Sequence, residues 1–126
     1  MGVVNPSEEK GILDTIIEML GYDATVMGSD HFYNQVMIHI NSVFSILRQL
    51  GLGDDKGYKI TSADNKWSEV EALVPDGNIE DIKTYIYLKV GLYFDPPTSS
   101  ILLSAIREEI LELEGRIKME VEIHEL

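Results

Sequence analysis

The residue types that most often carry chemistry are present in this chain, but they are not spaced for it. There is no cysteine, which excludes a thiol nucleophile and thiolate metal ligands. His31 and His39 fall on one expected helix, about 12 Å apart along its axis, which is too far to share one metal ion without ligands from elsewhere. His124 stands alone near the C-terminus. We therefore expect the histidines to have a surface or interface role and predict no metal site.

Three carboxylates, Glu108, Glu109 and Glu112, fall close together on the last expected helix. Such a group has the composition of a divalent cation site or of an acid-base pair. An acidic helix face also forms without either role, simply as a solvated surface, and we favour that interpretation. The rival function is an acidic metal-binding or hydrolytic protein that uses the Glu108 to Glu114 face, and it predicts stabilisation by cations.

No other motif supports catalysis or cofactor binding. Gly51-Leu52-Gly53 follows an expected helix and not a strand, and no Lys-Ser or Lys-Thr pair comes after it, so it is not a phosphate loop. A Gly-x-Ser-x-Gly nucleophile elbow is also missing from the sequence. We predict a protein that is not an enzyme and that needs no cofactor.

The charge of the chain is strongly acidic. It has 22 acidic residues against 10 basic ones, which gives a net charge of −12. The basic residues are spread singly along the sequence, and only Arg116 and Lys118 lie close together. Because gripping a DNA backbone requires several cations on one face, we do not expect specific DNA binding. Acidic walls would suit a channel through which DNA passes, but a solvated acidic surface explains the same charge.

The length and composition fit one soluble domain. A chain of 126 residues is near the commonest domain size, and its 44% hydrophobic and 25% charged residues are ordinary for a folded protein. The sequence has no apolar run of the roughly 18 residues that a membrane span needs, and its first residues do not have the pattern of a signal peptide. We expect no membrane association, whereas the absence of cysteine fits both an intracellular protein and a virus particle assembled in cytoplasm.

Hydrophobic periodicity predicts a mainly α-helical, single-domain bundle of about four helices, over residues 6–20, 30–50, 78–94 and 98–116. Asn5 and Pro6 are suited to begin the first helix, and Gly21 to end it in a left-handed conformation. Gly51-Leu52-Gly53 is expected to break the second helix.

The helix over 78–94 is predicted to be the central one. Asn78 is its expected cap, and its core face consists of Ile79, Ile82, Ile86, Val90 and Tyr93. Further apolar residues widen this face beyond the stripe that a surface helix needs, so other elements should cover the helix on most sides. Tyr85 and Tyr87 lack the basic neighbours of a base-stacking site, and we expect them to bridge core and interface.

A Phe-Asp-Pro-Pro corner must end the central helix. Pro96 forces Asp95 out of the helical conformation, and neither Pro96 nor Pro97 can donate a backbone hydrogen bond. The three residues after the prolines, Thr98 to Ser100, are all possible caps for the helix over 98–116. We expect this corner to set the angle between the two helices.

Two segments show a strand-like pattern. Residues 58–73 are predicted to form a protruding hairpin or loop, although the part from Lys66 could also start a short helix through Leu73. Trp67 within this segment would be either a lid over the bundle or an anchor at a subunit contact. In the tail over 117–126, Ile117, Met119, Val121 and Ile123 alternate with polar residues, although helical spacing also continues through Val121. We favour a C-terminal strand that pairs with the sheet edge of a partner in an assembly, and in the free protein we expect residues 119–126 to be frayed or to be a loose continuation of the last helix.

Three phrases of the sequence resemble the head-tail connector proteins of long-tailed bacteriophages. They are Thr84-Tyr85-Ile86-Tyr87-Leu88-Lys89-Val90, Phe94-Asp95-Pro96-Pro97-Thr98-Ser99-Ser100 and Glu112-Leu113-Glu114-x-Arg116. The resemblance implies a structural virion protein that forms a homo-oligomeric ring on the portal vertex, a dodecamer when on the portal. The ring would extend the channel through which double-stranded DNA passes without specific binding, and would dock a head-closure or tail-terminator protein.

The same resemblance implies a place in the virion neck, and in the host cytoplasm during assembly. It also places subunit contacts around Trp67 and along the two helices that flank Asp95-Pro96-Pro97. With the tail, the candidate interface residues are Trp67, Tyr85, Tyr87, Asp95, Pro96, Pro97, Met119, Val121 and Ile123. The alternative function is a small α-helical regulatory module that binds a protein without enzymatic activity, and it predicts a monomer or dimer without a ring.

Overall fold

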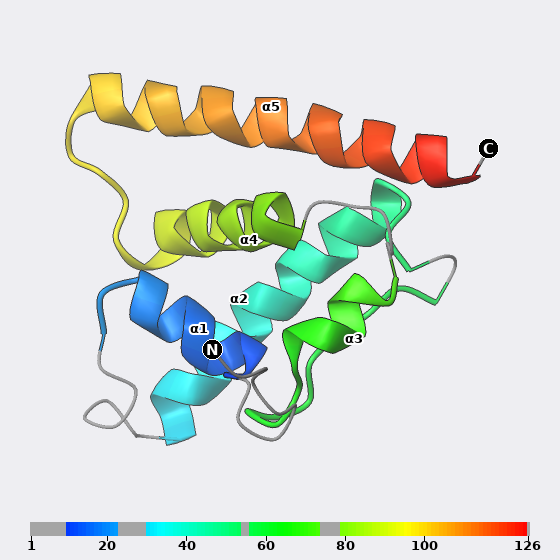
Figure 1. Cartoon of the computed structure of the whole chain (residues 1–126). Coiled ribbons are helices and arrows are strands. Elements are labelled where there is room, and N and C mark those ends of the chain that lie inside the picture. Colours follow the sequence, from blue (N-terminus) through cyan, green and yellow to red (C-terminus); the bar gives the residue numbers. More distant parts are fainter. Residues whose placement is uncertain (1–9, 23–29, 54–55, 74–78, 126) are drawn as a thin grey trace, which may run out of the picture.

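The computed structural model describes residues 10–22, 30–53, 56–73 and 79–125, and within them the protein is mainly α-helical (Figure 1). The helices are α1 (Ile12–Met19), α2 (Asp30–Gln49), α3 (Trp67–Glu71), α4 (Ile79–Phe94) and α5 (Ser100–Glu125). The predicted helical class is therefore confirmed. The predicted β elements are wrong, because the described residues contain no strand and only an isolated bridge between Gly11 and Lys66.

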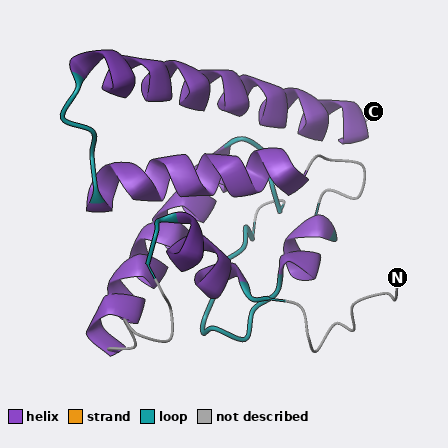
Figure 2. Ribbon diagram, turned by 60° about the vertical axis from the view of Figure 1, so that its left-hand side comes forward, coloured by secondary structure: helices purple, strands orange, loops and turns teal. Residues whose placement is uncertain are grey.

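Helix α4 is central, as its wide apolar face predicted. It packs against α1 and α2 on one side and against α5 on the other, and α5 runs antiparallel to it as an outer layer (Figures 1 and 2). The buried side chains of α4 are Ile82, Tyr85, Ile86 and Val90. Tyr93 was predicted to be in this core but is 54% exposed, and its ring stacks on His39 with the ring centroids 4.5 Å apart.

Glycines end the first two helices in the predicted way. Gly21 has a φ of 93°, and the N–H groups of Gly21 and Tyr22 donate to carbonyls of the last turn of α1 at 2.9 and 3.2 Å. Gly51 has a φ of 110° and ends α2 with the same pair of hydrogen bonds, from Gly51 to Arg48 and from Leu52 to Leu47. Both stops are left-handed positions that glycine occupies at low cost.

The start of α1 differs from the prediction. The helix begins at Ile12, and Lys10 and Gly11 precede it in a non-helical conformation. Gly11 is extended and pairs with Lys66, and a Cβ atom at this position would collide with the carbonyl oxygen of Ala63. This close approach to residues far along the chain keeps Gly11 out of the helix, and the predicted start at Asn5 and Pro6 lies outside the described residues.

Residues 58–73 do not protrude, so the predicted hairpin or loop protrusion is wrong. Ile60 is 1% exposed, and its backbone is held by the side chain of Asn41 on α2. The Ile60 N–H donates to Asn41 Oδ1 at 2.7 Å, and Asn41 Nδ2 donates to the Ile60 carbonyl at 2.9 Å. One amide side chain thus satisfies the two backbone groups that a neighbouring strand would otherwise pair with.

The C-terminal segment is helical, so the predicted strand is also wrong. Helix α5 continues to Glu125, with Ile110, Leu113, Ile117 and Val121 buried along one face. A helix satisfies its backbone hydrogen bonds internally, whereas a strand here would have no neighbour in this helical domain. Gly115 does not interrupt the helix.

Candidate docking groove between helices α4 and α5

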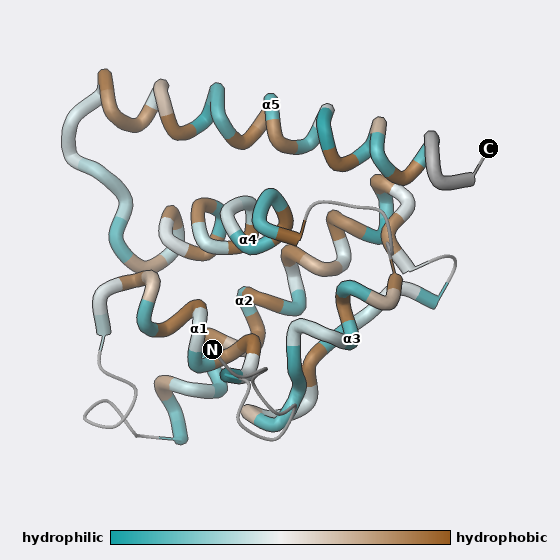
Figure 3. Tube along the Cα trace, in the orientation of Figure 1, coloured by the Kyte–Doolittle hydropathy of each residue, from teal (hydrophilic) through white to brown (hydrophobic). Residues whose placement is uncertain are grey.

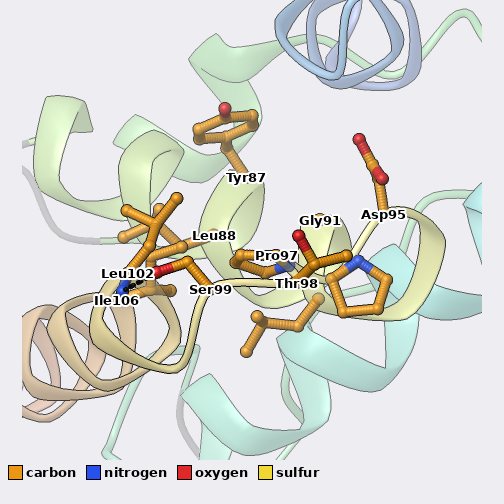
Figure 4. A pocket seen from close by; sticks show the side chains of 11 residues that line it. Tyr87, Leu88, Gly91, Asp95, Pro97, Thr98, Ser99, Leu102 and Ile106 are labelled. Carbon is orange, nitrogen blue, oxygen red and sulfur yellow. Dashed lines mark hydrogen bonds between the residues drawn. The ribbon is translucent and has the colours of Figure 1, made fainter.

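An open pocket of about 440 Å³ lies where α4 ends and α5 begins. We call it the corner groove. Its lining residues are Tyr87, Leu88, Gly91, Leu92, Asp95, Pro96, Pro97, Thr98, Ser99, Leu102 and Ile106 (Figure 4). The groove exists because the two helices diverge toward the start of α5 (Figure 1).

The corner that separates the helices is built as the prolines dictate. Helix α4 ends at Phe94, and the Asp95 N–H makes the last backbone hydrogen bond, to Gly91, at 2.8 Å. Two residues without an N–H group follow, which ends the helical pattern. Ser99 then caps α5, because its Oγ accepts from the Leu102 N–H at 3.3 Å and its carbonyl accepts from the Leu103 N–H at 3.0 Å. The predicted stop and the predicted serine cap are both confirmed.

The walls of the corner groove are largely apolar. Figure 4 shows Leu88 of α4 beside Leu102 and Ile106 of α5, with Pro97 next to them. Leu102 is 52% exposed, although it is a large hydrophobic residue at a helix surface. The carboxylate of Asp95 points away from these side chains. The arrangement is suited to receive apolar side chains of a partner, and it does not bring together an acid, a base and a nucleophile.

Two polar contacts hold the other half of α5 onto α4. The hydroxyl of Tyr85 donates to Glu114 Oε2 at 2.6 Å, and burial together with this hydrogen bond raises the pKa of Tyr85 well above its usual value of 10.0. Arg116 lies 3.4 Å from Asp81 of α4 and 3.4 Å from Glu112 of its own helix. The pair of helices is therefore tied together from its middle onward and open at the corner.

The structure brings four of the predicted interface residues together at the corner groove, namely Tyr87, Asp95, Pro96 and Pro97. Three others, Trp67, Tyr85 and Val121, have their side chains in the core of the same chain. Met119 is 61% exposed on the outer side of α5, and the side chain of Ile123 lies outside the described residues. An interface role for these residues stays a prediction.

Trp67 covers the core between α1 and α4. Its side chain is 3% exposed, its Nε1 donates to Thr15 Oγ1 at 3.1 Å, and Lys83 Nζ lies 5.2 Å from its ring centroid. Of the two predicted positions, a lid over the bundle and a subunit anchor, this packing matches the lid. The segment looked separate in the sequence because Thr15 and Lys83 are distant from it along the chain.

The acidic residues of α5 do not gather into a metal site. Glu108, Glu109 and Glu112 are exposed, and Glu112 lies 3.4 Å from Arg116. In the part of the chain that the structure describes, no group of three or more histidine or carboxylate side chains is placed to hold a metal ion. The carboxylates thus form a surface and not a coordination sphere.

A second pocket, of about 330 Å³, was missed by sequence reasoning. Arg48, Lys56 and Lys59 line it, together with Asn41, Phe44, Ser45, Gly57 and Tyr58. We call it the basic hollow. Its three cations are separated in the sequence, and the turn after Gly51 brings them together by folding the chain back onto α2. The glycines at 51, 53 and 57, all with positive φ, were the available signal of that turn.

None of the described helices has the length and apolar character that crossing a membrane requires. Neither the curated proteins nor the solved structures contain a match to this chain. The comparison with family models does give a match, to the family described as phage connector protein, over residues 12–124. That match begins at the first residue of α1 and ends near the last residue of α5, so it spans the whole described fold. The chain therefore belongs to the phage connector protein family.

Proposed function

We propose that this protein is a structural component of the neck of a long-tailed bacteriophage, where it forms a ring on the portal vertex. In this role it extends the DNA channel and offers a docking surface for the head-closure or tail-terminator protein that follows. The observation that carries the proposal is the family match over residues 12–124, because it includes every helix of the domain. The ring, a dodecamer on the portal, is assembled in the host cytoplasm and remains in the virion.

The surface of the protein supports assembly over catalysis. The first part of α5, from Ser100 to Glu109, contains no buried residue, and Ile101 and Leu102 are 83% and 52% exposed. Figure 3 shows hydrophobic stretches in the first turns of α5, where the helix is farthest from α4. Large apolar side chains next to an apolar groove are typical of surfaces that become covered by another protein.

The acidic surface fits the passage of DNA. With a net charge of −12, the protein as a whole repels a duplex, so DNA moves through the ring without being bound at specific sites. The same charge opposes self-association of free subunits, and the portal then serves as the template on which the ring closes. A free monomer is therefore compatible with the proposal.

Size-exclusion chromatography with light scattering tests the ring. The protein is measured alone and after mixing with the portal protein of the same phage, and a large cyclic species is expected in at least one case. A strict monomer in both measurements would contradict the proposal. A mass that corresponds only to a dimer would favour the alternative of a regulatory binding module.

The role of the corner groove is tested separately. A Leu102→Glu substitution places a charge in the groove at a position that is 52% exposed, so the fold should survive while capture by the portal or head-closure protein weakens. Ile38→Glu is the matched control, because Ile38 is 66% exposed on α2 and lines neither the corner groove nor the basic hollow. Equal binding by both variants and the wild type would show that the groove is not the docking surface.

A further inference from the structure

The basic hollow is held in shape before any partner binds. Gly57 has a φ of 68°, and a Cβ atom on it would lie 2.6 Å from Arg48 Cδ, so the backbone at Gly57 packs directly on the arginine stem. The ring of Tyr58 packs edge-on against Phe44 of α2, with the centroids 4.9 Å apart. These contacts fix the segment that carries Lys56 and Lys59 against the helix that carries Arg48.

The cations of the basic hollow are not neutralised within the described part of the chain. Three of the described cations lie within ion-pair distance of a described carboxylate, as Lys10 does at 2.6 Å from Glu18 and Lys83 at 3.5 Å from Glu80. No such contact joins Arg48, Lys56 or Lys59 to a carboxylate of the described residues. Three of the ten basic residues of an acidic protein therefore converge on one concave surface, and none of the three has an ion-pair partner among the described residues.

A complementary surface is found on the first part of α5. Glu108 and Glu109 are exposed, and no described cation lies within ion-pair distance of either one. They follow the exposed Ile101 and Leu102 on a stretch of helix that has no fully buried residue, although Ile106 packs partly against the core. This stretch thus offers carboxylates and apolar side chains to another molecule.

The basic hollow and the start of α5 lie at opposite ends of the domain, and Glu108 and Glu109 are about two turns further along α5 from its start. Figure 1 shows the start of α5 at one end and residues 56–60, beside the last turn of α2, at the other. A subunit cannot close this contact on itself, whereas two copies can form it head to tail. A row of subunits joined in this way has one free basic hollow at one end and one free acidic segment at the other. The row closes into a ring when the rotation between neighbouring copies permits it.

We propose that the basic hollow of one copy receives the Glu108 and Glu109 segment of the next copy around the ring. The inference rests on the proposed function, since it names the subunit contact of that ring. Arg48 and the two lysines form ion pairs with the carboxylates, and the neighbouring apolar side chains are covered at the same time. Charge complementarity favours a second copy over nucleic acid, because three cations on a subunit of net charge −12 give few phosphate contacts.

Site-directed crosslinking tests the contact directly, because the natural chain contains no cysteine. A chain with both Lys59→Cys and Glu109→Cys is treated with a short bis-maleimide, alone and with the portal protein. Ionic strength near 0.15 M limits long-range repulsion to a Debye length of about 8 Å while close ion pairs persist. The proposal predicts a covalent ladder of dimers, trimers and larger species, because each subunit carries one reactive group on each of the two surfaces.

The matched control carries Lys10→Cys and Glu109→Cys. Lys10 is exposed like Lys59 but does not line the basic hollow. The control chain should therefore give a crosslinked ladder at least several-fold weaker than that of the test chain. An equal ladder in control and test chains, or its absence from the test chain, would overturn the proposed contact. Light scattering on the same samples distinguishes failure of this contact from failure of the ring. An oligomer without the ladder means that the ring forms through another contact. A monomer in every sample contradicts both the contact and the ring.

A charge exchange adds a second criterion. Lys59→Glu alone and Glu109→Lys alone should each reduce oligomer formation, and the chain that carries both changes should recover it, because the pair is restored with reversed charges. Failure of the double variant to recover would refute pairing between these two positions. Binding of DNA by the wild type, lost in Lys59→Glu, would instead assign the basic hollow to phosphate.

Discussion

Replacing Gly115 with alanine should stabilise the protein, and this prediction tests the largest difference between sequence pattern and structure. The pattern favoured a helix that ends near Gly115 and a strand after it, whereas α5 runs without interruption from Ser100 to Glu125. If the helix is continuous in solution, Gly115 is an interior helical position. Glycine at such a position is unfavourable because it loses more backbone freedom on folding than alanine does.

The magnitude follows from the surroundings of Gly115. A Cβ atom built there has no neighbouring atom within 4 Å, so alanine introduces no steric cost. The substitution should then raise the free energy of unfolding by the propensity difference alone, about 0.5 to 1 kcal/mol. For a domain of this size that corresponds to a melting temperature higher by roughly 2 to 5 °C.

Gly51→Ala is the matched control for this measurement. Gly51 has a φ of 110°, and a Cβ atom on it would lie 2.7 Å from Val121 Cγ1, so alanine meets both backbone strain and a collision. We expect a loss of roughly 1 to 2 kcal/mol or more from the left-handed conformation alone. Urea unfolding followed by far-UV circular dichroism gives both values. A Gly115→Ala protein that is no more stable than the wild type would refute the continuous helix.

Three further substitutions have expected outcomes. Changing both Pro96 and Pro97 to alanine removes the stop between α4 and α5, and it should lower the melting temperature or alter the ring seen by electron microscopy; no change in either would make the corner incidental. Asn41→Ala removes two hydrogen bonds of 2.7 and 2.9 Å to a buried backbone segment, so urea unfolding should show a loss of about 1 to 3 kcal/mol, and a smaller loss would show that water replaces them. Because the pKa of Tyr85 is raised above 10.0 in the folded protein, the stability that its proton contributes is complete below pH 10.0 and is lost as the pH rises further. Tyr85→Phe should therefore flatten the fall in the free energy of unfolding above pH 10.0. A slope equal to that of the wild type would contradict the buried hydrogen bond.

The parts of the fold that the sequence predicted correctly depend on short-range chemistry. Gly21 and Gly51 end helices because left-handed backbone favours glycine, and Pro96 ends α4 because it has no N–H group to donate. The central position of α4 was also predictable, because its apolar face was too wide for a surface helix. Each of these features is decided by a residue and its immediate neighbours.

The parts that were predicted wrongly depend on residues far apart in the sequence. The alternation of Met119 and Val121 suits a strand, and the spacing from Ile117 to Val121 suits a helix, so periodicity alone did not decide between them. Val121 is 7% exposed because it meets Gly51 at the end of α2. That contact joins positions that only the folded chain brings together, and it favours the helix.

The same reason explains which functional residues were found. The corner groove contains Asp95, Pro96 and Pro97, which are consecutive and therefore visible as a motif. The basic hollow consists of Arg48, Lys56 and Lys59, which looked like scattered surface charges until the glycine turn was seen to fold them together. The net charge predicts repulsion between subunits, whereas the basic hollow is a local feature that a count of charges does not show. In the proposed ring, the basic hollow of one copy and the exposed Glu108 and Glu109 of the next would give two acidic subunits one local attractive contact, and such a contact fixes how the two copies approach.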